Sequence, residues 1–447
     1  MTTVNYLQAV QTYQPCELAV FQNANCIVST ANTQFENFQD IALNLGSTIN
    51  MELTYRFEAA DGLLAIDQPI TQRLHPLTVD QAAHVSIELT NPEKIFNLDK
   101  DRYMDKIGRS ASIALAAKVE SNVALNANSH VPVMVVDPTD SRRWIPSGAL
   151  RTESGPYMFF GDGATAINSY QQLQQMIEDF VEIGNPGGEF NVYLPNVEVP
   201  AVIGSGLAQF VPHRNEETAQ SWTIGDFGTP LVHYYKSNVL PVHFAGSIGN
   251  AVAPNNVLTV VSVNDVTGQN VTEIVCTTTV TDDADAIKSG DLGSFVAVSG
   301  VTPHFTTRNG KVATSQPVQV RFKSDAASVS TAITVSVICD DEQKGICWAA
   351  GANRNCDMPI VAGMKIQVMK SHKCGLLVSN KALYIAMPRL PAQSPFDSHS
   401  ESDPETGVAM RLAYATIPGQ NFQRVIHDCI WASTLVPSYA KRILFPL

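Results

Sequence analysis

The chain has 447 residues, of which 45% are hydrophobic, and its formal net charge is -13. This length predicts two or three structural units with a substantial buried core. Because no apolar run reaches the roughly 18 residues of a membrane-spanning helix, the composition predicts a soluble globular protein without a membrane span.

The first 55 residues contain no lysine or arginine, whereas acidic side chains stand at Glu17, Glu36, Asp40 and Glu52. This excludes a secretory signal, which starts with positive charge, and a basic arm for nucleic acid. Residues 1–48 are also rich in Asn, Gln and Thr, with little periodicity. We therefore expect an N-terminal arm that becomes ordered on another surface, with a neutral or basic partner.

Residues 49–58 alternate between apolar and polar side chains, the pattern of a strand with one covered face. The same alternation returns at 83–90. The segment between them contains the turn signal Asp61-Gly62 and two prolines. Because a long connection in a compact domain is usually functional, we predict that the two strands pair as an extended β-hairpin that reaches away from the body.

Residues 99–126 contain no proline and predict one long helix, with Asp99 as its N-cap. Apolar side chains recur about every four residues, and this stripe should pack under a sheet. The stripe comprises Tyr103, Ile107, Ala111, Leu115, Val119 and Val123, with Ala114 and Ala117 beside them. The opposite, polar face is expected to carry Lys100, Arg109, Lys118 and Glu120.

A short strand at 131–136, a second helix at 166–183 and a strand at 189–194 follow. A helix and strand in this order are compatible with a βαβ unit. No glycine-rich phosphate-binding motif accompanies them, so we do not expect nucleotide binding.

Residues 247–337 are rich in Val, Thr, Ser, Asn and Asp, and predict a small inserted β-barrel or sandwich. Within it, Asp282, Asp283 and Asp285 form an acidic run, which is either a solvated turn or a contact with basic residues of a neighbouring subunit. Four further strand-forming segments are expected at 364–369, 375–387, 408–414 and 422–431, with a polar loop at 391–407.

The eight cysteines include no CxxC pair, so we expect free buried thiols in a reducing cytosol. Cys347, Cys356, Cys374 and His372 could surround a metal, but their spacing matches no known site. We expect no metal and no cofactor.

Several short motifs occur in a characteristic order. They are KSGD at 288–291 followed by a strand and SGV at 299–301, AGMK at 362–365, NKAL at 380–383, and DCIWA at 428–432 leading to Pro437. This ordered set resembles the major capsid (coat) proteins of bacteriophages with the Hong Kong 97 fold, specifically the short-tailed Salmonella phage type with an inserted β-domain. The resemblance covers nearly the whole chain, except that the first 48 residues have no clear counterpart and a tail, YAKRILFPL, extends past Pro437.

The resemblance implies an α+β fold with an N-terminal arm, an extended β-hairpin (E-loop), a spine helix, peripheral and axial domains, and an inserted β-barrel. It divides the chain into the arm (1–48), the hairpin with peripheral-domain strands (49–90), the spine helix and peripheral domain (91–163), the first part of the axial domain (164–246), the inserted domain (247–337) and the C-terminal part of both domains (338–447).

The function implied is self-assembly into the icosahedral head shell of a tailed phage around double-stranded DNA. The implied partners are further copies of the chain in hexamers and pentamers, a separate scaffolding protein, a portal, a decoration protein, and DNA bound without sequence specificity. The location is the virion, after assembly in the host cytoplasm. No residue is nominated for a covalent crosslink.

Two other classes of function were weighed. An enzyme would need a set such as His213, His233 and His243 with Asp226, or His427-Asp428-Cys429, but no catalytic motif frames them. A phage tail or surface adhesin protein would fit the Thr- and Val-rich insertion, but explains neither the long helix nor the non-repeating architecture. We therefore predict no catalytic residue, and assembly contacts at Asp61, Gly62, Glu17, Glu36, Asp40, Asp282, Asp283 and Asp285.

Overall fold

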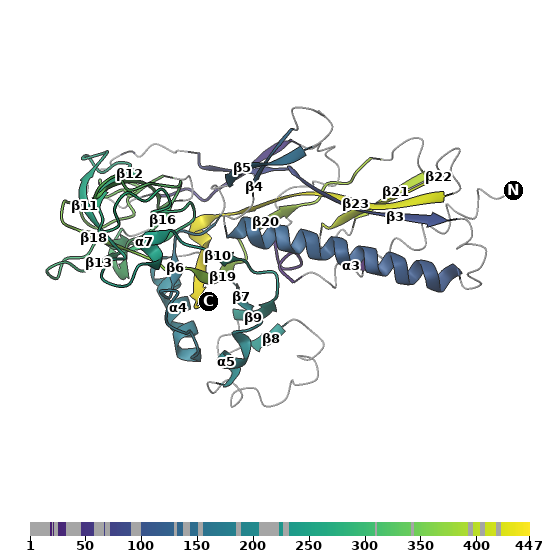
Figure 1. Cartoon of the computed structure of the whole chain (residues 1–447), viewed down its shortest axis with the longest axis horizontal. Helices are drawn as coiled ribbons and strands as arrows, with labels where there is room; N and C mark the ends of the chain where they lie inside the picture. Colours follow the sequence, from purple (N-terminus) through teal and green to yellow (C-terminus); the bar gives the residue numbers. More distant parts are fainter. Residues whose placement is uncertain are drawn as a thin grey trace.

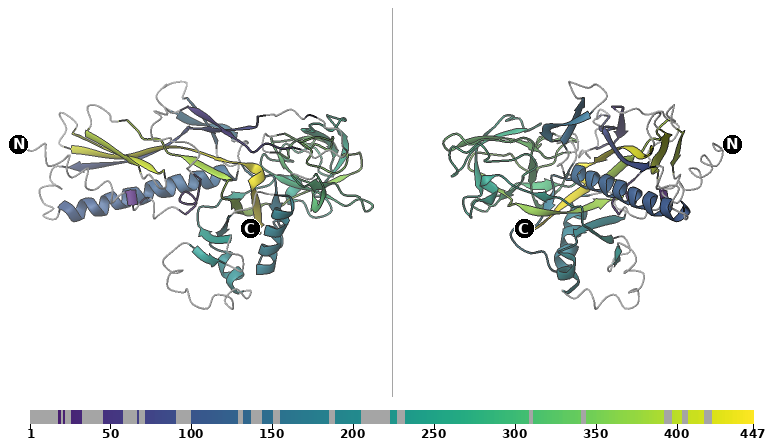
Figure 2. Two further views of the ribbon diagram at one scale, coloured as in Figure 1. Left: turned by 180° about the vertical axis from the view of Figure 1, so that it is seen from behind. Right: turned by 45° about the vertical axis from the view of Figure 1, so that its right-hand side comes forward.

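The computed structural model describes residues 18–19, 21, 26–32, 46–57, 67, 72–90, 100–128, 132–136, 144–150, 155–184, 189–204, 223–226, 232–308, 311–340, 344–391, 397–402, 407–416 and 422–447. The molecule is elongated. A long helix beneath a sheet forms one end, a β-barrel forms the other, and a second sheet with two helices lies between and below them (Figures 1 and 2). Within the described residues, no helix is both long and apolar enough to cross a membrane.

Helix α3 (Lys100–Ala127) confirms the predicted long helix and contacts β3 (Gln81–Thr90) and β23 (Phe422–Leu435). The predicted stripe is buried from Ala111 to Val123. The assignment of the two faces was partly wrong. Ala114 and Ala117 are exposed, whereas Glu120 is buried, because at about 3.6 residues per turn Glu120 falls on the same side as Ala116 and Ala124.

Three hydrogen bonds fix the register between the helix and the sheet above it. The Trp431 indole N–H donates to Asn122 Oδ1 at 3.2 Å, the Asn126 amide to Ser433 Oγ at 2.8 Å, and the Asn122 amide to Gln81 Oε1 at 3.1 Å. Apolar side chains fill the space around them, including Leu115, Val119, Val123 and Cys429. These bonds pair the Asn122 amide, the Asn126 amide nitrogen and the Trp431 indole N–H within the core.

The predicted pairing of the hairpin strands was wrong. Strand β1 (Thr48–Glu52) pairs antiparallel with β2 (Leu74–Thr78), and β3 pairs along ten residues with β23. Alternation predicted a strand at 83–90, but it does not indicate which strand pairs with it, the one at 49–58 or β23. The β1–β2 ladder buries Met51 and Leu77 against Ile430 and Ala432 of β23.

The sheet over α3 contains β20 (Leu383–Ala386), β21 (Asp397–Ser402), β22 (Ala409–Thr416), β23 and β3. Strand β21 lies within the segment predicted to be a polar loop, and it pairs with β22 along six residues. Its Ser, His and Glu side chains are typical of an edge strand, which is why composition alone indicated a loop.

A seven-stranded mixed sheet lies below α3 in Figure 1 and has the order β6 (Phe159–Phe160), β24 (Ala440–Phe445), β19 (His372–Ser379), β7 (Phe190–Pro195), β9 (Val232–Ser237), β8 (Thr223–Asp226), with β10 (Val242–His243) on β19. Helices α4 (Tyr170–Glu182) and α5 (Val199–Gly204) accompany it. The C-terminal tail is not an appendage, because β24 is completely buried between two strands.

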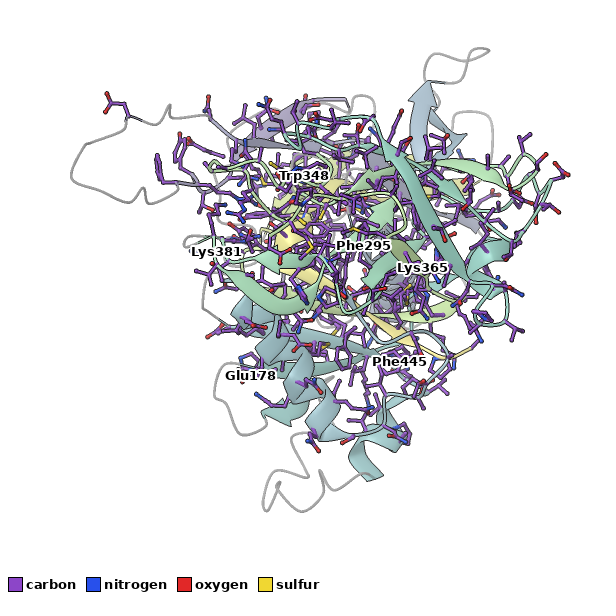
Figure 3. The ribbon with its side chains drawn as sticks, turned by 90° about the vertical axis from the view of Figure 1, so that its left-hand side faces the viewer. Glu178, Phe295, Trp348, Lys365, Lys381 and Phe445 are labelled. Atoms are coloured by element: carbon purple, nitrogen blue, oxygen red, sulfur yellow. The ribbon has the colours of Figure 1, made fainter. Side chains whose placement is uncertain are left out.

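The inserted unit is a closed barrel in the order β11 (Val257–Val263), β12 (Glu273–Thr277), β17 (Ala332–Ile338), β16 (Gln319–Phe322), β13 (Leu292–Val296), β18 (Lys365–Val368). In the end-on view of Figure 3, Phe295 lies among the packed side chains of the barrel, where it is almost fully buried. The predicted boundary at residue 337 is too early, because β18 joins β11 to β13 and closes the barrel.

The remaining elements are short. They are β4 (Pro132–Val136) paired with β5 (Trp144–Leu150), β14 (His304–Thr306) paired with β15 (Ala313–Pro317), helix α7 (Ser247–Asn250), and a 3₁₀ turn (Pro437–Tyr439) before β24. The second predicted helix is confirmed but begins at Tyr170, where Ser169 and Gln172 form a capping box.

Candidate assembly site

The sequence assigns two segments to arms, and described residues of both are bonded to the rest of the subunit. The first is the β1–β2 hairpin, whose residues 53–57 and 72–73, beyond the β1–β2 ladder, are called the hairpin root. Beyond β1 the chain stays extended, and Leu53 N–H donates to Arg73 C=O at 2.8 Å. The Thr54 hydroxyl contacts the Tyr439 hydroxyl at 2.7 Å, which joins the hairpin to the 3₁₀ turn.

A buried ion cluster anchors the same root to the barrel. Arg56 and Arg73 both reach Asp340 Oδ1, at 3.1 and 3.3 Å, and all three side chains are almost completely buried. Asp340 lies two residues after β17 of the barrel. Removing one partner of a buried ion pair leaves an uncompensated charge, at a cost of about 3–5 kcal/mol, so this cluster holds the hairpin firmly against the inserted unit.

Tyr55 and Phe57 alternate with these anchors and point outward. Their exposed fractions are 41% and 49%, high for aromatic side chains. The alternation predicted for 49–58 ends here: Met51 and Leu53 are buried as expected, whereas Tyr55 and Phe57 at the next two positions of the same face are exposed. The hairpin root therefore presents two exposed aromatic side chains next to a buried ion cluster.

The second fixed segment is residues 26–32. Cys26 and Ile27 N–H donate to Glu120 Oε1 at 3.1 and 2.7 Å, and Val28 N–H donates to Oε2 at 3.2 Å. Further along, Asn32 N–H donates to Leu383 C=O at 2.9 Å. The N-terminal region is thereby attached to both the long helix and the sheet.

A third polar cluster joins the barrel to the seven-stranded sheet. His243 Nε2 lies 2.6 Å from Asp291 Oδ1, and Asp291 Oδ2 accepts hydrogen bonds from Gly246 N–H at 3.1 Å and Lys288 N–H at 2.9 Å. Gly290, just before Asp291, has a φ of +88°, which favours glycine. These contacts explain the KSGD motif, whose aspartate closes the junction.

Two buried arginines complete this junction. Arg442 of β24 donates to Gly290 C=O at 3.2 Å and to Asn128 C=O at 2.7 Å, thereby linking the barrel, α3 and the central sheet. Arg321 of β16 donates to Gly155 C=O. Burial lowers the pKa of Arg321 to about 9, with Arg442 adding repulsion, so Arg321 stays charged at neutral pH.

The predicted contact residues divide into two groups. Asp61, Gly62, Glu17, Glu36 and Asp40 lie outside the described residues. Asp282, Asp283 and Asp285 lie in one turn of the barrel unit, where Asp282 accepts from Ser330 N–H at 2.8 Å and Asp283 from Asp285 N–H at 2.9 Å. Both hydrogen bonds join groups of the barrel unit itself. The side chains of Asp282 and Asp285 are exposed.

Sequence reasoning missed Glu120, Asp340 and Arg442 as anchors. The helical period could have placed Glu120 among the buried positions, since Ala116 and Ala124 lie four residues away on either side. Asp340 and Arg442 carry no local signal, because their partners are distant in sequence.

Of the residues considered for an enzymatic site, Asp226 and His233 lie opposite each other on the paired strands β8 and β9. Asp428 binds Arg411, with Arg411 Nε at 3.0 Å from Oδ1, and His243 belongs to the barrel junction. His213 lies outside the described residues.

The seven described cysteines are free and buried, as predicted, and burial raises the pKa of Cys276 and Cys356 to about 12. Among described residues, no group of three His, Cys, Asp or Glu could hold a metal ion.

No protein-family model matches the chain. No curated protein sequence matches it either. Three solved structures illustrate the likeness found by structural comparison. The capsid of Ralstonia phage GP4 has a TM-score of 0.42 and 8% identity, covering 94% of this chain and 88% of that chain. The Cyanophage Pam1 capsid has a TM-score of 0.40 and 10% identity, covering 92% and 87%. The holo-SrpI encapsulin of Synechococcus elongatus PCC 7942 has a TM-score of 0.30 and 8% identity, covering 84% and 78%.

Proposed function

We propose that the chain is the major capsid protein of a tailed bacteriophage and self-assembles into the icosahedral shell that encloses double-stranded DNA. The observation that carries this proposal is the rigid root of the β1–β2 hairpin. There, a buried Arg–Asp–Arg cluster holds the strand while Tyr55 and Phe57 face outward. A rigidly held strand with outward aromatic side chains suits a subunit that functions by binding its neighbours. The ordered motifs at 288–301, 362–365, 380–383 and 428–437, which resemble those of phage coat proteins, support the same proposal.

The finer assignment follows the sequence resemblance. We propose the short-tailed Salmonella phage type, with α3 as spine helix, β1–β2 as the base of the E-loop, the α3-covered sheet in the peripheral domain and the seven-stranded sheet in the axial domain. The inserted domain is extended to about residue 369 so that it includes β18. Hexamers and pentamers of the chain, a scaffolding protein, a portal and a decoration protein are its partners in the host cytoplasm and the virion, and the role is not enzymatic.

A tail or surface adhesin protein is the alternative. The Thr- and Val-rich barrel motivates it, but the barrel is a single unit embedded between β10 and β19 of a larger body. Adhesive stalks are built from stacked repeats, whereas the described elements form no repeating unit. The geometry therefore favours the shell subunit.

The test replaces residues 58–71, which lie beyond the anchored root, with a short Gly-Ser linker. A deletion that reached residue 79 would also remove β2 and Arg73, so it would confound assembly with folding. We expect a folded, soluble subunit that forms no closed shells in electron micrographs when it is expressed with the other head proteins of its phage. A double substitution of Tyr55 and Phe57 to Ser should weaken assembly in the same direction. Normal shells from the linker variant would contradict the proposal.

A further inference from the structure

Glu120 is a carboxylate on the buried face of an otherwise apolar stretch of helix. Its immediate helical neighbours on that face are Ala116, Val123 and Ala124, all fully buried. Both of its oxygens face a segment more than ninety residues earlier in the chain, and together they accept the three consecutive N–H groups of Cys26, Ile27 and Val28. A side chain that merely filled space here would be apolar.

Because both sides of the contact are buried, the Glu120 carboxylate and the N–H groups of residues 26–28 each need the other as a hydrogen-bond partner. A buried carboxylate without donors, or three buried N–H groups without an acceptor, would each destabilise the folded state, because these groups would lose their hydrogen bonds to water without replacement. Burial raises the pKa of Glu120, and the three backbone hydrogen bonds act against that rise. The ionised form can accept at all three positions, whereas an amide would turn an N–H₂ group toward one donor.

The segment held by Glu120 continues into further contacts with the body. Ile27 and Val28 are buried in the cluster around α3, and the Thr30 hydroxyl bonds the Tyr193 hydroxyl of the central sheet. Ile385 N–H donates to Asn32 C=O at 3.2 Å, so that Asn32 bridges to β20. On the other side of the held residues, Phe21 is fully buried in the same cluster.

We propose that Glu120 is the positioning residue of the N-terminal region: its carboxylate fixes residues 26–28 on α3 and thereby keeps the described part of this region, including Phe21, packed against the body. Loss of this carboxylate releases Phe21 and residues 26–28 from α3, while α3, β23 and both sheets remain folded. The inference concerns the single subunit, so it holds independently of the proposed shell function.

The experiment compares Glu120→Gln with Glu88→Gln in the full chain. Glu88 is an exposed residue of β3, so its substitution makes the same charge change without touching the segment. Chymotrypsin is the probe, because the chain before Arg56 offers trypsin no site and Phe21 is shielded while the segment is docked. Amide hydrogen exchange of Cys26, Ile27 and Val28 is measured in parallel.

We expect cleavage after Phe21 to become at least about tenfold faster in Glu120→Gln, and protection of the three amides to fall by a similar factor, about 1.4 kcal/mol, while the amides of α3 and β23 keep their protection. Glu88→Gln should match the wild-type protein. If Glu120→Gln fails to fold, Glu120→Asp keeps the charge but shortens its reach, and it should show the same local release. Unchanged cleavage and protection, or a loss of protection that spreads equally through α3 in every folded variant, would overturn the proposal.

Discussion

The contact between His243 and Asp291 shows how a buried pair can bind a proton without making stability depend on pH. Burial raises the pKa of Asp291 to about 7. Burial, followed by repulsion from Arg442 and Lys288, lowers the pKa of His243 to about 3. Between these values the folded pair holds one proton. The unfolded chain also holds one, on histidine, below about pH 6.5. Since folding then exchanges no proton, the pair adds little slope to the pH dependence.

Asp291→Asn should break this balance. The folded variant would keep a neutral His243, whereas the unfolded chain would still bind a proton below about pH 6.5, so its free energy of unfolding should fall as the pH falls from about 6.5 to 4.5. At neutral pH the cost should be small, because the asparagine oxygen can still accept from Gly246 and Lys288 N–H while its N–H₂ group donates to the neutral His243 Nε2. Melting temperatures of both proteins across this range provide the measurement. Parallel pH profiles would show that the pair does not share its proton in this way.

At the scale of elements, the inserted barrel depends on a strand that comes after the apparent end of the insertion. Strand β18 pairs with β11 on one side and β13 on the other, and Ile366 and Val368 are fully buried in the barrel core. Without β18, two strands would expose free edges and the interior would open along one side. The linker 344–364 that delivers β18 also packs on the barrel through Ile346 and Cys356.

We therefore expect a fragment of residues 246–369 to unfold cooperatively, whereas residues 247–337 alone should show no cooperative transition. The fragment is large enough to fold independently, and its core is continuous once β18 is present. Thermal unfolding followed by circular dichroism would distinguish the two. Cooperative melting of the shorter piece would mean that closure by β18 is not required.

Local patterns predicted most elements, and long-range partners account for the differences. Alternation predicted the strand at 83–90, and the helical period predicted the buried positions from Ala111 to Val123, because each pattern reports the covered face of its own element. The pairing of β1 with β2, the closure of the barrel and the central position of β24 depend on residues far apart in the chain. Among the anchors, Asp291 was visible in a motif, but Glu120 was not, because its acceptor role depends on three backbone groups that carry no sequence signature.

At the scale of the whole molecule, buried polar anchors connect the main parts of the fold. The barrel, the central sheet and α3 meet at Arg442, and the hairpin root is tied to the barrel through Asp340. In an assembling subunit, such a body would keep its arms in fixed starting positions, so that less conformational freedom is lost when neighbours bind. The charge of those arms then decides which partners they attract.

The N-terminal arm has no cation before Arg56, and this charge leads to the last prediction. A shell wall that bound DNA through many cations would hold it by salt-dependent contacts, whereas an acidic arm gives DNA nothing to bind. Such an arm would suit a basic segment of a scaffolding protein, through surface ion pairs worth only about 0–1 kcal/mol each and therefore easily released. The competing explanation is that the arm packs along a neighbouring subunit and that its charge is incidental.

Replacing Glu17, Glu36 and Asp40 with glutamine and asparagine separates the two explanations. If the arm recruits scaffold, its incorporation into procapsids should fall, most strongly at low salt, where the Debye length is longest and charge pairs matter most. The melting temperature of the subunit should stay the same, because surface ion pairs contribute little to folding stability and each substitution keeps the size of the side chain. Glu88→Gln and Asp282→Asn, both at exposed positions, serve as controls for the change in net charge. Scaffold content that does not change at any salt concentration would assign the arm to subunit packing, where shape and not charge determines its position.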